Sequence, residues 1–167
     1  MPVAHSLDNG TPETPGTRYT RALVKLTRAV WHPDCSLQTA LGVICETAAQ
    51  ALGVARVNVW RFEPEVPQLV CIHDYALASD THAPAETFET LPLDGDYAEF
   101  LQYVRAIDAQ DVETDPSTAT SHGALRDYLR RHRICSLLDA PVRVEGELVG
   151  VICHEQVGSP CAWTPEE

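Results

Sequence analysis

The chain has 167 residues, of which 44% are hydrophobic and 22% are charged, a length and composition typical of one folded domain. Its formal net charge of −12 argues against a nucleic acid or an anionic membrane surface as a partner. No apolar run is long enough to span a bilayer, and the polar N-terminus lacks the apolar core of a signal peptide. We therefore expect a cytoplasmic protein without membrane contact.

The first third of the chain predicts a disordered start followed by two helices. Residues 1–16 contain three Pro, two Gly and almost nothing to bury, so we expect them to be disordered. Apolar residues then recur at helical spacing over residues 17–31, with Thr17 as the N-terminal cap. A second helix runs to Leu52, with Asp34 or Ser36 as its cap.

The middle of the chain predicts a hairpin, a loop and a short edge strand. Val54–Phe62 and Gln68–Tyr75 are rich in β-branched and aromatic residues and are predicted to form an antiparallel pair. The polar residues 76–85 predict a loop without regular structure. Phe88–Leu93 fits a short edge strand.

Two further helices and a short strand follow. Asp94-Gly95-Asp96 caps a helix whose apolar face includes Tyr97 and Phe100. Residues 106–109 predict a short strand, and residues 111–120 predict a loop. Ser121 is expected to cap the next helix.

The chain ends with a predicted hairpin and the beginning of another helix. Ser136–Val144 and Leu148–Val157 are the strands, and Glu145-Gly146 is the turn, because Gly tolerates positive φ. Residues 164–167 combine a Thr cap, a Pro at the first helical position and two acids, which is typical of a helix start. We therefore expect the chain to be part of a longer protein.

Hairpins at both ends with helices between them indicate an α+β fold with an antiparallel sheet. Several segments in this order also resemble one known family: Arg56–Phe62, Ile107–Asp111, Thr114–Pro116, Leu138–Val142, Gly146, Gly150–Glu155, Val157-Gly158 and Trp163–Glu167. Together they resemble GAF domains, the sensory modules of bacterial signalling proteins, and most closely those attached to sensor histidine kinases and diguanylate cyclases.

The resemblance covers about residues 20–167 and implies a definite architecture. The fold would be GAF-like (profilin-like), a three-layer arrangement with helices on both faces of a twisted five- or six-stranded antiparallel sheet. Residues 17–167 would form the GAF domain, truncated before its C-terminal helix. The expected function is that of a non-catalytic sensory or regulatory module in a multidomain bacterial signalling protein, such as a protein of a two-component system.

Cysteine chemistry gives the main alternative. Cys71 and His73 are two residues apart in one predicted strand, so we expect both side chains on the same face, although their separation is long for a direct hydrogen bond. Some GAF proteins reduce free methionine sulfoxide with a set of cysteines, and this enzyme class is the alternative function. The Gly- and Cys-rich segment that marks those enzymes is not evident, and six free thiols are the default in a reducing cytosol.

Other cofactors have weaker support. The histidines lack the i, i+4 spacing of a zinc protease, so we expect no metal. Phytochrome-type GAF domains attach a bilin through a Cys-His pair in or beside a central helix, whereas Cys153-His154 lies in the last strand. A cyclic nucleotide would need a phosphate site, which the N-terminus of a helix can provide. Two predicted helix starts are candidates, but Asp94 and Asp96 would repel the phosphate from one of them. We expect no cofactor.

What remains is a small-molecule pocket between the central helices and the sheet, where the resemblance places the ligand. An apolar pocket with a few convergent polar groups is the ordinary form of such a site, although the same aromatic residues also fill cores. The candidate ligand-binding residues are Tyr97, Phe100, Leu101, Tyr103, Asp108, Asp111, Arg126, Tyr128, Leu129 and His154. For His154 a structural hydrogen bond to a neighbouring strand or helix is favoured over ligand contact.

The first helix also predicts self-association. Its apolar residues Tyr19, Leu23, Leu26 and Val30 cover a wide arc, and exposed apolar faces of this kind mark interaction sites. Two-fold association of like surfaces is the commonest outcome. We expect a homodimer through the N-terminal helices.

Overall fold

The computed structural model describes residues 14–29, 34–63, 65–93, 95–119 and 123–166. Its elements, in chain order, are α1 (Pro15–Ala29), α2 (Leu37–Leu52), β1 (Arg56–Glu63), β2 (Gln68–Ala76), β3 (Thr81–His82), the 3-10 turn η1 (Ala85–Thr87), β4 (Thr90–Pro92), α3 (Gly95–Tyr103), β5 (Ile107–Ala109), α4 (Pro116–Ala119), α5 (Ala124–Arg131), β6 (Ile134–Val144) and β7 (Glu147–Val157). None of the helices in these ranges is long and apolar enough to cross a membrane.

The strands form one antiparallel sheet in the order β3-β2-β1-β7-β6-β5, and β4 pairs with the other end of β2. The predicted α+β antiparallel fold is confirmed. The sheet has seven strands, and the one that the sequence did not predict is the two-residue β3, which lies in the expected loop 76–85.

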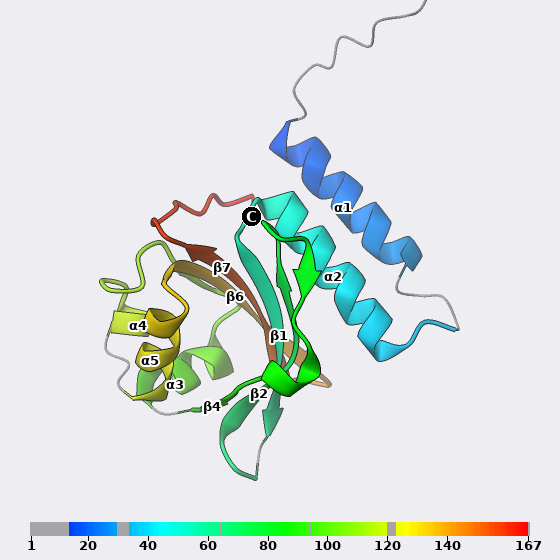
Figure 1. Ribbon diagram of the computed structural model, residues 1–167. Coiled ribbons are helices and arrows are strands. Elements are labelled where there is room, and N and C mark those ends of the chain that lie inside the picture. Colours follow the sequence, from blue (N-terminus) through cyan, green and yellow to red (C-terminus); the bar gives the residue numbers. More distant parts are fainter. Residues whose placement is uncertain (1–13, 30–33, 64, 94, 120–122, 167) are drawn as a thin grey trace, which may run out of the picture.

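Helices cover both faces of this sheet (Figure 1). Helix α2 packs on one face against Val57, Val59 and Tyr75, and α1 lies alongside α2, farther from the sheet. Helices α3, α4 and α5 lie on the opposite face, above a larger core that includes Trp60 and Leu101. The two faces therefore have separate cores, joined only through the sheet.

Helix ends follow local capping chemistry. The predicted cap Ser36 accepts a hydrogen bond from the backbone N–H of Thr39 (3.1 Å), and Gly53 ends α2 with a φ of 71°. The predicted cap Thr17 was wrong by three residues, because Thr14 accepts from the Thr17 N–H and Pro15 takes the first helical position. The expected caps Asp94 and Ser121, the end of the first helix at Trp31 and most of segment 1–16 lie outside the described residues.

One further prediction needed correction, in the central loops. The expected loop 111–120 contains the short helix α4. Asp115 directly precedes this helix and accepts a hydrogen bond from the Ser117 N–H (2.9 Å). At the end of the chain Pro165 and Glu166 form a turn, and the described residues do not test whether a helix follows. The closing hairpin is confirmed, with positive φ at Glu145 (53°) and Gly146 (92°) in its turn.

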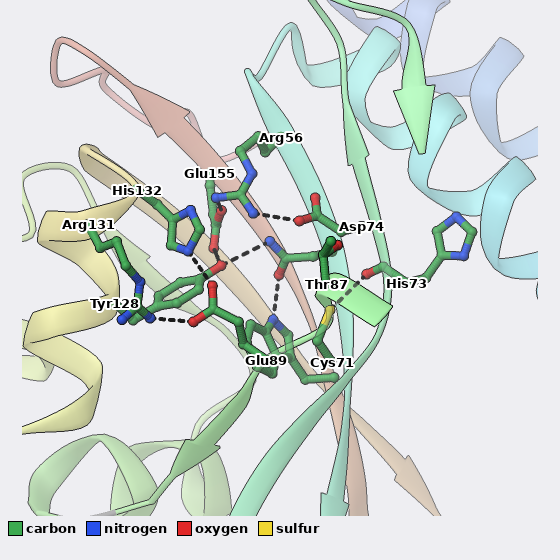
Figure 2. A network of polar contacts seen from close by, with 12 residues as sticks. Arg56, Cys71, His73, Asp74, Thr87, Glu89, Tyr128, Arg131, His132 and Glu155 are labelled. Atoms are coloured by element: carbon green, nitrogen blue, oxygen red, sulfur yellow. Dashed lines mark hydrogen bonds and ion pairs between the residues drawn. The ribbon is translucent and has the colours of Figure 1, made fainter. Parts of the chain in front are cut away.

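A bulge in β2 overturns the prediction that Cys71 and His73 share a face. Val59 of β1 pairs with His73, while the next residue, Trp60, pairs with Cys71, so Ile72 is an extra residue in β2. Cys71 consequently lies in the core with Trp60, whereas the His73 ring lies against Gly42 of α2 (Figure 2). The two side chains lie on opposite faces of the sheet.

Candidate functional site

A polar cleft of about 150 Å³ opens on the face of the sheet that carries α5. Strands β1 and β2 form its floor, the segment from η1 to β4 forms one wall and α5 forms the other (Figure 2). Its lining residues are Arg56, Trp60, Cys71, Asp74, Thr87, Phe88, Glu89, Tyr128 and His132.

Three charged side chains from three adjacent strands meet at the floor of this cleft. Arg56 of β1 pairs with Asp74 of β2 (Nη2 to Oδ2, 2.6 Å) and with Glu155 of β7 (Nη1 to Oε2, 3.1 Å). The side chains are only 15%, 19% and 3% exposed, respectively. The contact between Nη1 and Oε2 has ion-pair distance but not hydrogen-bond geometry, so both atoms keep unused hydrogen-bonding capacity.

Burial and charge set the protonation of this network. Burial raises the pKa of Glu155 from its ordinary 4.5 to about 7, although Arg56 opposes the rise. Burial alone would lower the pKa of Arg56, but Glu155 and Asp74 raise it above its ordinary value. The guanidinium is therefore charged throughout, and Glu155 is the group whose charge changes near neutral pH.

Aromatic and amide groups extend the network beneath the cleft. The Tyr128 hydroxyl donates to Glu155 Oε1 (2.8 Å), and Asn58 Nδ2 donates to the Tyr128 oxygen (3.4 Å). The Trp60 indole N–H donates to Asn58 Oδ1, and its ring meets Tyr128 edge-on at 5.4 Å between centroids. These contacts fix the two large aromatic side chains with little freedom to reorient.

A second set of charges ties the two walls of the cleft together. His132, the residue that ends α5, contacts Glu89 (Nε2 to Oε1, 2.6 Å), and Arg131 also pairs with Glu89. The His132 ring packs on Tyr128 with centroids 4.6 Å apart. Because Glu89 comes directly before β4, these contacts hold α5 against the wall that precedes that strand.

A small internal cavity, of about 10 Å³, lies deeper in the same core. This volume is about that of one water-sized probe, so the space between the central helices and the sheet is almost filled by side chains. Buried Asp139 lines it and accepts from the Tyr97 hydroxyl through Oδ2 (2.6 Å), while its Oδ1 has no hydrogen-bond partner. Burial raises the pKa of Asp139 from its ordinary 3.8 to about 6.

The predicted pocket residues divide between this core and the surface. Tyr97, Leu101, Tyr128 and Leu129 are buried together, and Phe100 packs against them. Of the ten, only Tyr128 also lines the open cleft.

The other predicted residues lie elsewhere. Tyr103 is 83% exposed at the end of α3, and Asp108 is exposed on β5. Asp111 accepts from the Glu113 N–H (3.0 Å), and Arg126 pairs with Glu113 (2.8 Å), so both organise the loop around α4.

His154 makes the strand-to-strand hydrogen bond that was predicted for it. Its Nδ1–H donates to the carbonyl oxygen of Leu138 on β6 (2.7 Å), the residue directly opposite it in the sheet. Burial lowers its pKa, which favours the neutral ring.

Sequence reasoning missed Arg56, Asp74, Glu89 and His132 of the cleft, and Asn58 and Glu155 in the network beneath it. Part of the signal was present, because Asn58 and Glu155 are polar residues inside β-branched strand segments. Such residues are buried together only when their polar groups hydrogen-bond to each other. Asp74 was hidden by the bulge at Ile72, which turns it toward the cleft.

Metal and covalent chemistry have little support at this site. Within the described ranges, no group of three or more His, Cys, Asp or Glu side chains is arranged to hold a metal ion. The Cys71 thiol in the cleft floor is 5% exposed, and burial raises its pKa to about 12, which disfavours the reactive thiolate.

Comparison with known proteins decides the family. A family model described as the GAF domain matches residues 36–167, most of the chain. The chain belongs to the GAF domain family. No curated protein sequence matches it. GAF domains are generally sensory and non-catalytic, and membership supports a sensory role for this one.

Several solved GAF structures share the fold. One from Synechocystis sp., in its photoproduct state, is 27% identical over 78% of this chain and 82% of that one, with a TM-score of 0.60. The GAF domain of a Coxiella burnetii phosphoenolpyruvate-protein phosphotransferase is 15% identical over 92% and 85%, with a TM-score of 0.65. The phycocyanobilin-bound GAF domain of a cyanobacterial phytochrome is 15% identical over 93% and 87%, with a TM-score of 0.62.

Proposed function

We propose that this GAF domain is a non-catalytic sensory module that recognises a small polar molecule in the cleft above Arg56. The observation that carries the proposal is the meeting of Arg56, Asp74 and Glu155 at the base of a concave site. Burying charges is costly, and their concentration in a cleft is typical of functional sites. Arg56 and Asp74 line the cleft, so a ligand there would meet one cationic and one anionic side chain, with Glu155 buried beneath them.

The size of the cleft limits the ligand. Its 150 Å³ is below the range of about 300–1,000 Å³ that is common for drug-sized ligands. A tetrapyrrole such as those in the bilin-bound neighbours would have to displace the lining side chains, and the sequence has no cysteine between Ile72 and Ile134 to attach one. We therefore propose a ligand considerably smaller than a bilin.

A cleft-filling variant tests this site. Compounds with few non-hydrogen atoms, including amino acids, nucleobases and carboxylic acids, are screened by thermal shift, because a ligand that binds only the folded state raises Tm. A Thr87→Phe variant should lose the shift given by a hit, and a Thr90→Phe variant on β4, outside the lining, should keep it. A shift retained in Thr87→Phe, or a screen without a saturable hit, would count against the proposal.

The non-catalytic role has its own test. The alternative, reduction of free methionine sulfoxide, needs a reactive thiolate, and the cleft cysteine is buried with a raised pKa. The purified domain is incubated with free methionine sulfoxide and a thiol reductant, together with Cys71→Ser. Turnover that depends on a cysteine would show that the domain is an enzyme and would contradict the proposed non-catalytic role.

We also propose that the domain acts within a larger cytoplasmic signalling protein of bacterial type and pairs as a homodimer through α1. Leu23 and Val24 on this helix are 63% and 42% exposed, which supports an interaction face. Sedimentation over a concentration and salt series should show a dimer that strengthens as salt screens the repulsion between like-charged subunits. Leu23→Glu should give a monomer, whereas Val144→Glu on exposed β6 should leave the dimer intact.

A further inference from the structure

A chain of four polar side chains crosses from α2 to β3 on the face of the sheet opposite the cleft. We call it the histidine cluster, consisting of Gln38, Glu46, His73 and His82. His73 Nδ1 lies 3.2 Å from Gln38 Oε1, His73 Nε2 lies 2.8 Å from His82 Nδ1, and His82 Nε2 lies 3.0 Å from Glu46 Oε1. The two rings lie against α2 at Gly42, where an added Cβ would be 3.7–3.8 Å from their atoms.

The contacts of the histidine cluster fix the number of protons that it holds. Gln38 Nε2 donates to the carbonyl of Ile72 (3.5 Å), so Gln38 Oε1 faces His73 as an acceptor and His73 Nδ1 must carry a proton. Burial, and next His82, lower the pKa of His73, so that ring is neutral and its Nε2 is an acceptor.

His82 must therefore donate on both sides. Its Nδ1–H points to His73 Nε2, and its Nε2–H points to the Glu46 carboxylate. All three hydrogen bonds form together only when the two rings carry three N–H groups, one more than two neutral rings supply, and the lowered pKa of His73 places the additional proton on His82. Without that proton one contact has no hydrogen, and with a second proton on His73 two N–H groups face each other at 2.8 Å.

Other titratable groups around the histidine cluster do not supply this proton. Among the described residues, Cys45 of α2 is buried with its pKa raised to about 12, and Tyr75 of β2 donates its hydroxyl to Asp80 (2.8 Å), while its ring packs on His82. Asp74 is a further carboxylate that acts on His73, but its side chain is on the cleft side, paired with Arg56.

The histidine cluster also connects to the cleft along the chain. His82 is half of the two-residue β3, and Ala83 N–H donates to the carbonyl of Asp74 (2.9 Å). The chain then forms η1 and reaches Thr87, which lines the cleft wall five positions after His82. Loosening β3 would therefore free one end of this wall.

We propose that the histidine cluster is a proton-dependent latch, in which a single shared proton holds β3 against α2 and its loss, or the gain of a second proton, releases β3 and loosens the cleft wall. This device adds a pH response that does not depend on which ligand the cleft binds. The latch is closed between two titration steps and opens on either side of them.

Nitrogen NMR of the histidine side chains tests the proton assignment directly. In the intact domain, His82 should have both ring nitrogens protonated while His73 is neutral with its proton on Nδ1. Two results, if seen at every pH between 5 and 9, would overturn the proposal. One is a neutral His82 that donates to neither partner, and the other is a His73 tautomer protonated on Nε2.

Hydrogen exchange measures the opening. The protection factors of the amides of Ala83, Thr87 and Phe88 should pass through a maximum with pH and fall by about tenfold on either side, the factor expected for one charge-assisted hydrogen bond. Glu46→Gln should abolish this maximum, and Glu99→Gln on α3, the same change of charge away from the cluster, should retain it. Protection that is independent of pH in the unaltered domain, or a maximum that persists in both Glu46→Gln and His82→Gln, would refute the latch.

Discussion

Replacement of Asp139 by Asn removes a carboxyl group that is 1% exposed and lines the internal cavity. The folded protein raises the pKa of Asp139 from 3.8 to about 6, because burial disfavours the charged form. The folded state thus holds the Asp139 proton more tightly than the unfolded chain does. The stability that this proton contributes is complete below pH 3.8 and is lost as the pH rises through about 6.

The size of this effect follows from the two pKa values. At 1.36 kcal/mol for each pH unit, the gap between 3.8 and about 6 is worth about 3 kcal/mol. Asn cannot ionise, so the unfolding free energy of Asp139→Asn relative to the original protein should rise by about 3 kcal/mol between pH 3 and pH 7. Most of that gain should appear between pH 4 and pH 6. The new amide N–H adds a penalty of about 1–3 kcal/mol if it finds no partner, but this term is independent of pH.

Urea unfolding followed by circular dichroism at several pH values gives the difference in unfolding free energy between the two proteins directly. The contributions of other titrating groups cancel in this difference. Asp108→Asn is the matched control, because Asp108 lies on the neighbouring β5 and is exposed. A stability difference for Asp139→Asn that is flat with pH, or that shrinks as the pH rises, would refute the reasoning.

Three further outcomes are expected. In native Ellman titration, three thiols should react quickly and three only on unfolding, the protected ones being the buried Cys45, Cys71 and Cys153. Gly150→Ala should lower the unfolding free energy by about 1–3 kcal/mol in urea denaturation, since its Cβ would lie 2.3 Å from the Trp60 carbonyl oxygen, whereas Gly42→Ala should be tolerated. Tyr128→Phe should cost about 1–3 kcal/mol and raise the pKa of Glu155, measured by carboxyl NMR, because it removes the donor to that carboxylate.

Much of the fold could be predicted from the sequence because local signals agreed with the tertiary structure. Periodicity identified α2 and the long strands, and the Glu145-Gly146 turn identified the closing hairpin. The short elements β3 and α4 were missed because two to four residues carry little pattern and these two depend on pairing and capping.

The candidate site was harder to predict for a physical reason. Strand alternation gives the correct face only while the register holds, and one extra residue at Ile72 reversed it for His73 and Asp74. The buried pairing of Arg56 with Glu155 joins residues far apart in the sequence, which no local pattern reveals. Aromatic residues of the central helices were visible, but the structure uses most of them to fill the core.

The two edges of the sheet have a consequence for crowded assemblies. The strand order ends at β3 with two residues and at β5 with three, and β5 pairs with only residues 137–139 of the longer β6. Long open edges recruit strands from neighbouring molecules and lead to aggregation. The β3 edge therefore offers few free backbone groups to another strand, whereas residues 140–144 of β6 extend beyond β5, and Pro141 among them has no backbone N–H to donate.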